Sequence, residues 1–293
     1  MLIQLILFFA LLIGAYLLIN VFSKSGLSIA IAELLSELFY LAGGLSLAWL
    51  MARFVDRRPY ADFGFHLDRK WWMDLGFGLV LGAFLMTGIF LSLKAAGWKT
   101  AIVTATTKYD VSFFWAFLLK VVMFAIVAIN EELAFRGYLL RNLAEGFSYH
   151  RIGAQGAIIS ALLLSATAFG LGHLANQDAT ILSTLNLIVS GLVIGLSYLL
   201  TRELGISIGM HLTWNLFMGT VFGFPVSGAA PTTHLFSIQQ TGPILWTGGV
   251  FGPEGGLIFF VWLFIGSGLM VLWIKWLRKQ ITLHTPLAVY TAE

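Results

Sequence analysis

Residues 113–140 read FFWAFLLKVVMFAIVAINEELAFRGYLL, an apolar run that carries Glu131, Glu132 and Arg136 near its end. About 20 mostly apolar residues can cross the hydrocarbon core of a bilayer as one helix. An ionisable side chain inside such a helix costs at least about 2.5–3.5 kcal/mol on insertion scales, and it is therefore a candidate functional group. The run predicts a membrane-spanning helix that carries chemistry within the membrane.

The composition of the whole chain also indicates a membrane protein. Of 293 residues, 59% are hydrophobic and 11% are charged, with a mean hydropathy of +0.89, whereas soluble domains carry roughly twice that charge. This composition excludes a disordered chain, a collagen and a nucleic-acid-binding domain. The net charge of +3 fits basic loops that face anionic lipid. The chain lacks cysteine, which excludes disulfides, thiolate metal sites and cysteine nucleophiles.

Eight apolar stretches are long enough to span a bilayer. They predict an all-α polytopic bundle of about eight transmembrane helices, forming one integral membrane domain over residues 1–293. The first stretch has neither a positively charged start nor a small-residue cleavage site, so we interpret it as a retained helix. The predicted spans are 2–22, 28–52, 73–96, 113–140, 157–175, 181–201, 205–224 and 257–277.

The distribution of lysine and arginine predicts the orientation, because cytoplasmic loops carry an excess of both. With eight spans, eleven basic residues fall on the side of the two termini and four on the other. We therefore expect both termini in the cytoplasm, the segment 225–256 outside, and a bacterial inner membrane as the location. The eleven are Arg53, Arg57, Arg58, Arg69, Lys70, Arg141, Arg151, Arg202, Lys275, Arg278 and Lys279; the four are Lys24, Lys94, Lys99 and Lys108.

Pairs of glycines one helical turn apart occur in several predicted spans. Small residues at this spacing allow two helix backbones to approach closely, so ordinary helix packing is the favoured interpretation. The pairs are Gly78/Gly82, Gly191/Gly195, Gly205/Gly209 and Gly219/Gly223.

The two adjacent glutamates are predicted to have different roles. Glu132 and Arg136 are four residues apart and share one helix face, so they form a candidate structural ion pair. Glu131 points about 100° away from Glu132 and is not neutralised by that pair. Glu131 is therefore the candidate that faces a cavity.

Two further spans carry polar side chains: His173 ends the fifth, and His211 and Asn215 lie one turn apart in the seventh. Polar groups on three separate helices predict one convergent site inside the bundle. A carboxylate and an imidazole can activate water, and N–H donors can stabilise an oxyanion. Glu131, His173 and His211 could instead bind zinc with water in the open position, so zinc is a possible cofactor.

These residues resemble the motifs of the CPBP family of intramembrane proteases, which includes type II CAAX prenyl endopeptidases and bacteriocin-processing, Abi-like relatives. The pattern is Glu-Glu-x-x-x-Arg, Phe-x-x-x-His and His-x-x-x-Asn, matched here over roughly 112–224 by Glu131 to Arg136, Phe169 to His173, and His211 to Asn215. The resemblance implies an eight-helix endopeptidase that acts on membrane-associated proteins or peptides, including prenylated ones. It further implies that Glu131 and His173 activate water and that His211 and Asn215 stabilise the oxyanion.

Two other functions stay open at this point. Intramembrane Glu and His residues also relay protons in transporters, although carriers often have repeated halves and this polar cluster is confined to one half of the chain. A catalytically silent bacteriocin-immunity protein could keep the same fold. The depth of the site is a further question, because Glu131 falls in the cytoplasmic half of its span, whereas His173 lies towards the far end of 157–175. A deeper, tilted or broken fifth helix would bring the two level.

Overall fold

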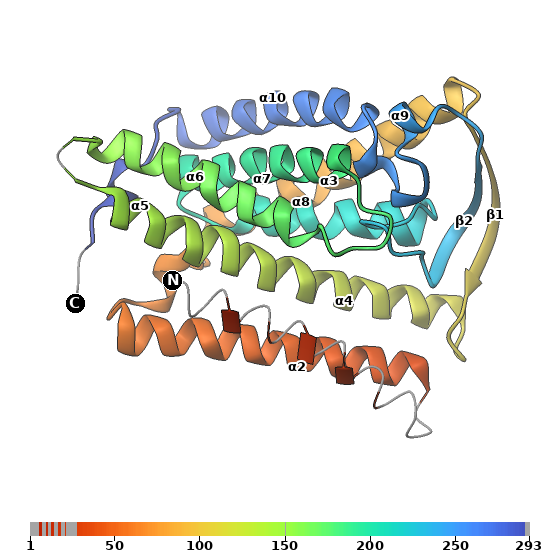
Figure 1. Ribbon diagram of the computed structural model, residues 1–293, viewed down its shortest axis with the longest axis horizontal. Coiled ribbons are helices and arrows are strands. Elements are labelled where there is room, and N and C mark those ends of the chain that lie inside the picture. The colour runs from red at the N-terminus through yellow and green to blue at the C-terminus, as the bar shows by residue number, and fades with distance from the viewer. Residues whose placement is uncertain are drawn as a thin grey trace.

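The computed structural model describes residues 6–7, 10, 13–14, 17–18, 21, 28–149 and 151–290. Its long helices form one elongated bundle, with a small sheet at one end (Figure 1). The elements are α2 (Ile29–Leu50), η1 (Met51–Val55), η2 (Tyr60–Phe63), α3 (Arg69–Ala95), β1 (Lys99–Thr107), α4 (Phe113–Glu132), η3 (Leu133–Leu140), α5 (Arg141–Phe147), α6 (Gly153–Gly172), α7 (Ile181–Thr201), α8 (Gly205–Asn215), η4 (Leu216–Val221), β2 (Thr233–Gln240), α9 (Ile244–Thr247), η5 (Gly249–Phe251), η6 (Pro253–Gly255), α10 (Ile258–Arg278) and η7 (Thr285–Ala288).

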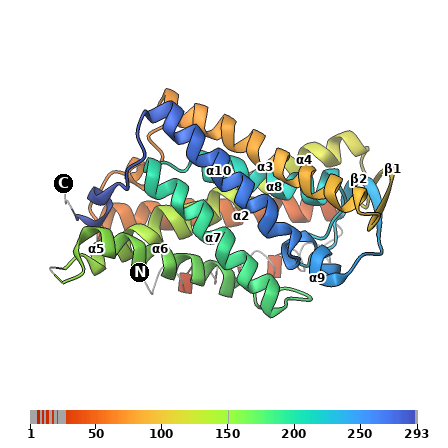
Figure 2. The ribbon, with the colours of Figure 1, turned by 90° about the horizontal axis from the view of Figure 1, so that it is seen from above.

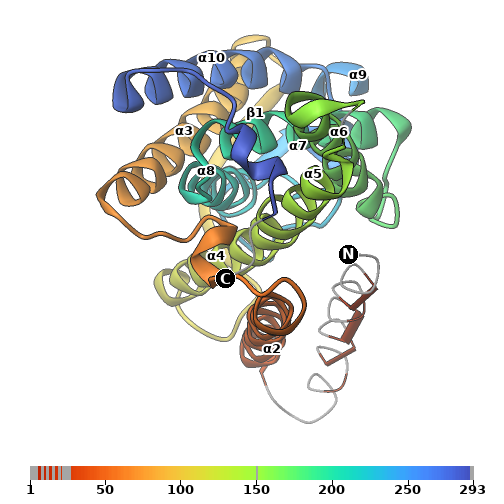
Figure 3. The same cartoon turned by 90° about the vertical axis from the view of Figure 1, so that its left-hand side faces the viewer.

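Helix α8 lies inside the bundle, and ten of its eleven residues are buried. The end view shows α8 between α3, α4 and α7, whereas α2 lies outside this group and packs against α4 (Figure 3). Helix α10 runs diagonally across the bundle, over α3 and α7 (Figure 2). Because α8 is enclosed by other helices, polar side chains on it are shielded from lipid.

Six of the predicted spans correspond to helices that are long and apolar enough to cross a membrane: 29–55, 69–95, 113–147, 153–172, 181–201 and 258–278. The first predicted span, 2–22, falls for the most part outside the described residues. The seventh, 205–224, is a correction. Its helix ends three residues earlier than predicted, at Val221, and has eleven α-helical and six π-helical residues, a length at the lower end of the range for a spanning helix.

Two of the predicted glycine pairs bring α3 and α8 into backbone contact. A Cβ built on Gly78 would lie 2.4 Å from the carbonyl oxygen of Ile206, and one on Gly209 would lie 2.4 Å from that of Leu75. The absence of side chains at these positions therefore sets the distance between the two helices. Gly219 and Gly223 are different: Gly223 ends the η4 helix with a φ of +70° and meets the backbone of β2 rather than another helix.

Adding one methyl group at this contact is expected to destabilise the bundle. In Gly82→Ala the new Cβ would lie 2.3 Å from the carbonyl oxygen of Met210, so α8 has to shift, at a cost of about 1–3 kcal/mol. Gly76→Ala is the matched control on the same helix, because no atom lies within 4 Å of its Cβ position. Thermal unfolding in detergent should show a lower Tm for Gly82→Ala alone. Equal Tm values for both variants would contradict this account of the packing.

The two strands were not predicted from the sequence. β1 and β2 pair antiparallel, from Lys99 with Gln240 to Thr107 with Thr233, and they lie at the end of the molecule opposite α5 (Figure 1). The segment 225–256, predicted as a loop, therefore contains β2, α9, η5 and η6 and folds back onto the bundle.

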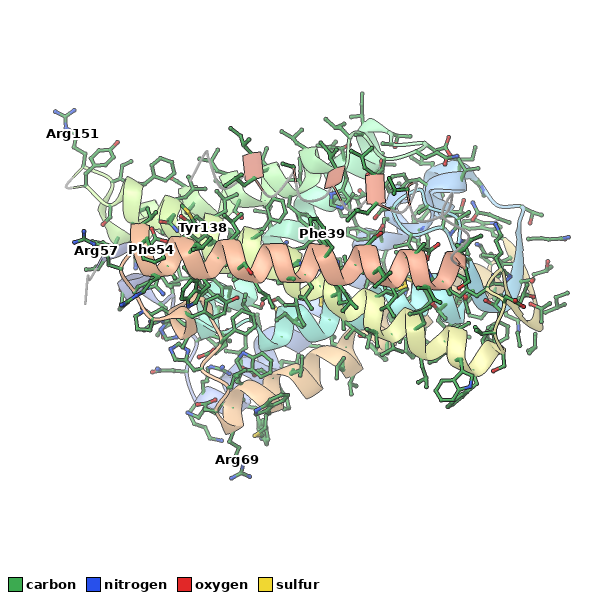
Figure 4. The ribbon with its side chains drawn as sticks, turned by 90° about the horizontal axis from the view of Figure 1, so that it is seen from below. Phe39, Phe54, Arg57, Arg69, Tyr138 and Arg151 are labelled. Carbon is green, nitrogen blue, oxygen red and sulfur yellow. The ribbon has the colours of Figure 1, made fainter. Side chains whose placement is uncertain are left out.

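Basic residues that were assigned to the cytoplasmic side from the sequence lie at the end of the bundle that holds α5. Arg57, Arg69 and Arg151 are exposed and project outward there (Figure 4). Buried ion pairs hold the same end together: Arg58 lies 2.6 Å from Glu145, and Arg278 lies 2.5 Å from Asp74. The charge asymmetry counted along the sequence is thus also an asymmetry between the two ends of the folded chain.

Candidate active site

A cavity of about 270 Å³ lies inside the bundle, bounded by α4, α6, α7, α8, α10 and the segment 225–256. Its wall combines apolar side chains with polar groups that come from distant parts of the sequence. Polar side chains on this wall include Glu131, His173, His211, Asn215, Ser227 and Glu254.

The two adjacent glutamates face different surroundings. Glu131 lines the cavity and its side chain is 15% exposed, whereas the side chain of Glu132 is fully buried. Glu132 Oε1 lies 2.9 Å from Nη1 of Arg136. The guanidinium of Arg136 also lies over the ring of Phe169, 4.5 Å from its centroid. The cavity-facing carboxylate is therefore a separate group from the ion-paired one.

His211 connects the two glutamates. Its Nδ1 lies 2.9 Å from Oε1 of Glu132, and its Nε2 lies 3.8 Å from Oε2 of Glu131. An ionised carboxylate only accepts hydrogen bonds, so Nδ1 carries a proton and Nε2 is the atom directed at Glu131. The gap of 3.8 Å is too long for a direct hydrogen bond, and a water molecule beside it could contact both groups. The contact between Glu132 and His211 was not anticipated from the sequence.

His173 is held by the helix that it ends. It is the C-terminal cap of α6, and its Nδ1 donates to the carbonyl oxygen of Phe169 at 2.8 Å. The ring of Phe169 also packs against the ring of His173, with centroids 4.8 Å apart. Because Nδ1 donates, Nε2 of a neutral His173 is an acceptor that is left for the cavity. Phe169 therefore positions both Arg136 and His173, a role that the sequence did not reveal.

Asn215 completes the side of the cavity formed by α8. It lies one turn after His211 and is 7% exposed. Within the described part of the chain, its side-chain amide makes no hydrogen bond to another residue. Its N–H groups are thus left for a molecule in the cavity.

The backbone changes its winding next to the site on both helices. Helix α4 becomes π-helical immediately after Glu132, and α8 becomes π-helical immediately after Asn215. Single π-helical turns within α-helices occur frequently at functional sites. Both changes from α-helix to π-helix therefore lie directly beside polar residues of the candidate site.

The difference in depth between Glu131 and His173 is smaller than the predicted spans implied. The helix of Glu131 continues to Phe147, seven residues beyond the predicted end at 140, and α6 begins at 153 rather than 157. Counted from the α5 end, Glu131 is 16 residues (147 − 131) and His173 is 20 residues (173 − 153) along its helix. At 1.5 Å per residue these positions are about 24 and 30 Å deep, and α6 is an unbroken α-helix.

Sequence reasoning missed Glu254 and Ser227, which line the same cavity from the segment 225–256. The hydroxyl of Ser227 donates to Oε2 of Glu254 at 2.6 Å, and the indole N–H of Trp214 donates to Oε1 at 3.0 Å. One signal was present in the sequence, because Glu254 is the only Asp, Glu, Lys or Arg between residues 225 and 256.

The three candidate zinc ligands do not form a ligand set in this structure. Among the described residues, no group of three or more His, Asp or Glu side chains is close enough to hold one metal ion. Nδ1 of His173 contacts a carbonyl oxygen and Nδ1 of His211 contacts Glu132, which leaves Nε2 of each ring for a molecule in the cavity. A hydrolytic reaction can be derived from the side chains of the cavity wall alone.

Residues of the three motifs, carried by α4, α6 and α8, thus meet around one cavity. Residues 112–217 match the family described as type II CAAX prenyl endopeptidase Rce1-like. No curated protein and no solved structure matches the chain. At the level of the family, the Rce1-like match supports a CAAX-type intramembrane protease in an integral membrane protein.

The Rce1-like match covers Glu131, Glu132, His173, His211 and Asn215. It ends before the segment 225–256, which supplies Ser227 and Glu254 to the cavity. That part of the wall lies outside what the family match describes.

Proposed function

We propose that this protein is an intramembrane endopeptidase in which Glu131 activates water to hydrolyse a peptide bond of a membrane-associated protein or peptide. The observation that carries the proposal is that Glu131, His173, His211 and Asn215 line one cavity, with Oε2 of Glu131 3.8 Å from Nε2 of His211. A carboxylate and an imidazole on one cavity wall can contact the same water molecule.

In the proposed reaction, the water donates one hydrogen bond to Glu131 and another to Nε2 of His173. Glu131 takes a proton as the water oxygen attacks the carbonyl carbon of the substrate. The same proton then moves from Glu131 to the leaving nitrogen as the C–N bond breaks. The products are a carboxyl group and an amine, so the atoms balance without an additional reactant.

The negative charge that develops on the carbonyl oxygen is assigned to His211 and Asn215. When both ring nitrogens of His211 carry a proton, Nδ1 donates to Glu132 and Nε2 presents an N–H group to the cavity. The free amide of Asn215 supplies a second donor one turn away. Preorganised donors of this kind are usually the largest single contribution to acyl-transfer catalysis, and the loss of one costs about 10²–10³ in kcat.

The family match favours prenylated CAAX-type substrates, and we propose that these are cleaved. The excess of basic residues at the α5 end favours placing this end in the cytoplasm of a bacterial inner membrane, with the chain terminus at Glu293 on that side. A reporter fused after Glu293 would test the orientation, and an extracytoplasmic signal would overturn it.

The test of the proposed function is cleavage in proteoliposomes. Purified protein is incubated with a farnesylated peptide that ends in a CAAX sequence and with the same peptide lacking the farnesyl group, and mass spectrometry identifies the products. We expect cleavage after the modified cysteine. If neither peptide is cleaved, and no membrane-associated peptide in a wider panel is cleaved, the proposal is overturned.

Removal of metal ions is expected to leave cleavage unchanged, because the side chains around the cavity are sufficient for the proposed reaction. The measurement is the rate after dialysis against a chelator and again after addition of zinc, with metal content determined in parallel. A rate that falls by more than about tenfold and returns with zinc would mean that His173, His211 and Glu131 rearrange into a metal site.

A further inference from the structure

Glu254 is a buried carboxylate on the cavity wall, 5% exposed, on η6 between β2 and α10. Three neutral groups donate to it. Oε1 accepts from the indole N–H of Trp214 at 3.0 Å, and Oε2 accepts from the backbone N–H of Ser227 at 3.1 Å and from the Ser227 hydroxyl at 2.6 Å. A carboxylate has about four acceptor positions, so these bonds fix its orientation and leave one position unused.

The backbone of this segment is fixed by contacts that do not involve the carboxylate. The amide of Asn186 donates to the carbonyl oxygens of Glu254 at 2.6 Å and of Gly256 at 3.1 Å. Gly228 donates its N–H to the carbonyl oxygen of Phe251 at 3.0 Å. Gly252 has a φ of +98°, and a Cβ there would lie 2.2 Å from the carbonyl oxygen of Pro225. The segment is thus fastened independently of the negative charge.

Glu254 has no cationic partner in the described part of the chain. None of the Lys, Arg or His side chains described lies within ion-pairing distance of it, and the cavity wall contains no Lys or Arg. Buried charges are normally paired because of the free energy needed to remove them from water. The wall also carries Glu131, so a cationic group that entered the cavity would be attracted.

We propose that Glu254 forms a specificity subsite that takes the cationic side chain of a lysine or arginine close to the scissile bond of the substrate peptide. This inference rests on the proposed function only where it concerns cleavage, because the subsite can bind a cationic side chain without any catalysis. Ser227 and Trp214 position the carboxylate, and the charge-assisted hydrogen bond to the substrate fills its remaining acceptor position. The subsite belongs to the segment outside the family match, so it would distinguish this chain's substrates within the family.

The experiment compares farnesylated peptides that differ only in lysine or norleucine, placed in turn just before the modified cysteine and at each position after it. For the native protein we expect kcat/KM to be at least roughly tenfold higher with lysine at one of these positions, the effect of one hydrogen bond to a charged group. Glu254→Gln should bring the ratio close to one while it still cleaves the norleucine peptide. Glu254→Asp should keep part of the preference, because it retains the charge.

Glu203→Gln is the matched control, because it removes a carboxylate at the α7–α8 connection, where Glu203 pairs with His66 at 2.7 Å; the lysine preference should persist. A native protein without lysine preference at any position overturns the subsite whether or not the variants fold. An equal loss of cleavage of both peptides in Glu254→Gln also overturns it, since that result indicates a structural role.

Binding to the Glu131→Gln protein separates the subsite from the proposed reaction. Tighter binding of the lysine peptide than of the norleucine peptide, lost when Glu254→Gln is added, supports the subsite even if the native protein cleaves nothing. Cleavage by the native protein without any lysine preference supports the reaction and overturns the subsite.

Discussion

Glu131→Gln is expected to abolish peptide cleavage while the bundle stays folded. Glutamine has the shape of glutamate but cannot take a proton from water, and general-base catalysis typically contributes about 10²–10⁴ to a rate. The substitution also removes one of two adjacent negative charges, so the stability should hold or rise. Initial cleavage rates in proteoliposomes and thermal unfolding in detergent, measured on the same preparation, provide the two readouts.

Asp74→Asn serves as the control for loss of a buried carboxylate elsewhere. Asp74 is fully buried and pairs with Arg278 at the α5 end, so its replacement should lower the Tm and act on cleavage only through folding. A Glu131→Gln protein that melts like the native one and cleaves at a rate within a factor of about ten would remove Glu131 from the role of base.

Glu132→Gln is expected to have the largest effect on stability. Glu132 is fully buried and contacts both Arg136 and His211 at 2.9 Å. Its neutralisation leaves the buried guanidinium without a counter-charge, which typically costs about 3–5 kcal/mol. His211 also loses the carboxylate that holds its Nδ1 proton. We therefore expect low yield, a lower Tm and loss of cleavage together.

A double variant distinguishes loss of the ion pair from loss of the histidine contact. Glu132→Gln with Arg136→Met removes both charges, and it should recover part of the Tm without recovering cleavage. The two single variants also test which glutamate is the base and which one is structural. If Glu131→Gln melts the bundle and Glu132→Gln keeps both fold and activity, then Glu132 is the base and Glu131 belongs to the structural network.

Much of the helical fold could be predicted from the sequence, because apolar length alone identifies a span. The helix Ile181–Thr201 agrees with its predicted range at both ends. The pairing of β1 with β2 could not be predicted, since the two strands are more than 120 residues apart and nothing in either local sequence identifies its partner. The helix predicted over 205–224 ends at Val221, because the chain turns towards β2 at Gly223, which has a φ of +70°, and hydropathy does not reveal such a turn.

Part of the candidate site could also be predicted from the sequence. Glu131, His173 and His211 stand out because ionisable groups are costly in apolar helices. Phe169 is marked in the sequence only by the resemblance to the Phe-x-x-x-His motif, and its contacts with Arg136 and His173 appear only in three dimensions. Glu254 lies in a stretch whose sequence resembles an exposed loop, and only the return of this segment to the bundle brings it to the cavity.

The central claim is that Glu131 directs hydrolysis of a peptide bond inside the bundle. The most direct measurement is cleavage of a membrane-associated peptide in proteoliposomes made in water labelled with heavy oxygen, for native protein and Glu131→Gln side by side. The account predicts that the native protein produces a fragment with one labelled oxygen in its new carboxyl group, and that Glu131→Gln, with an undiminished Tm, produces none. Labelled product formed at similar rates by both proteins would contradict it.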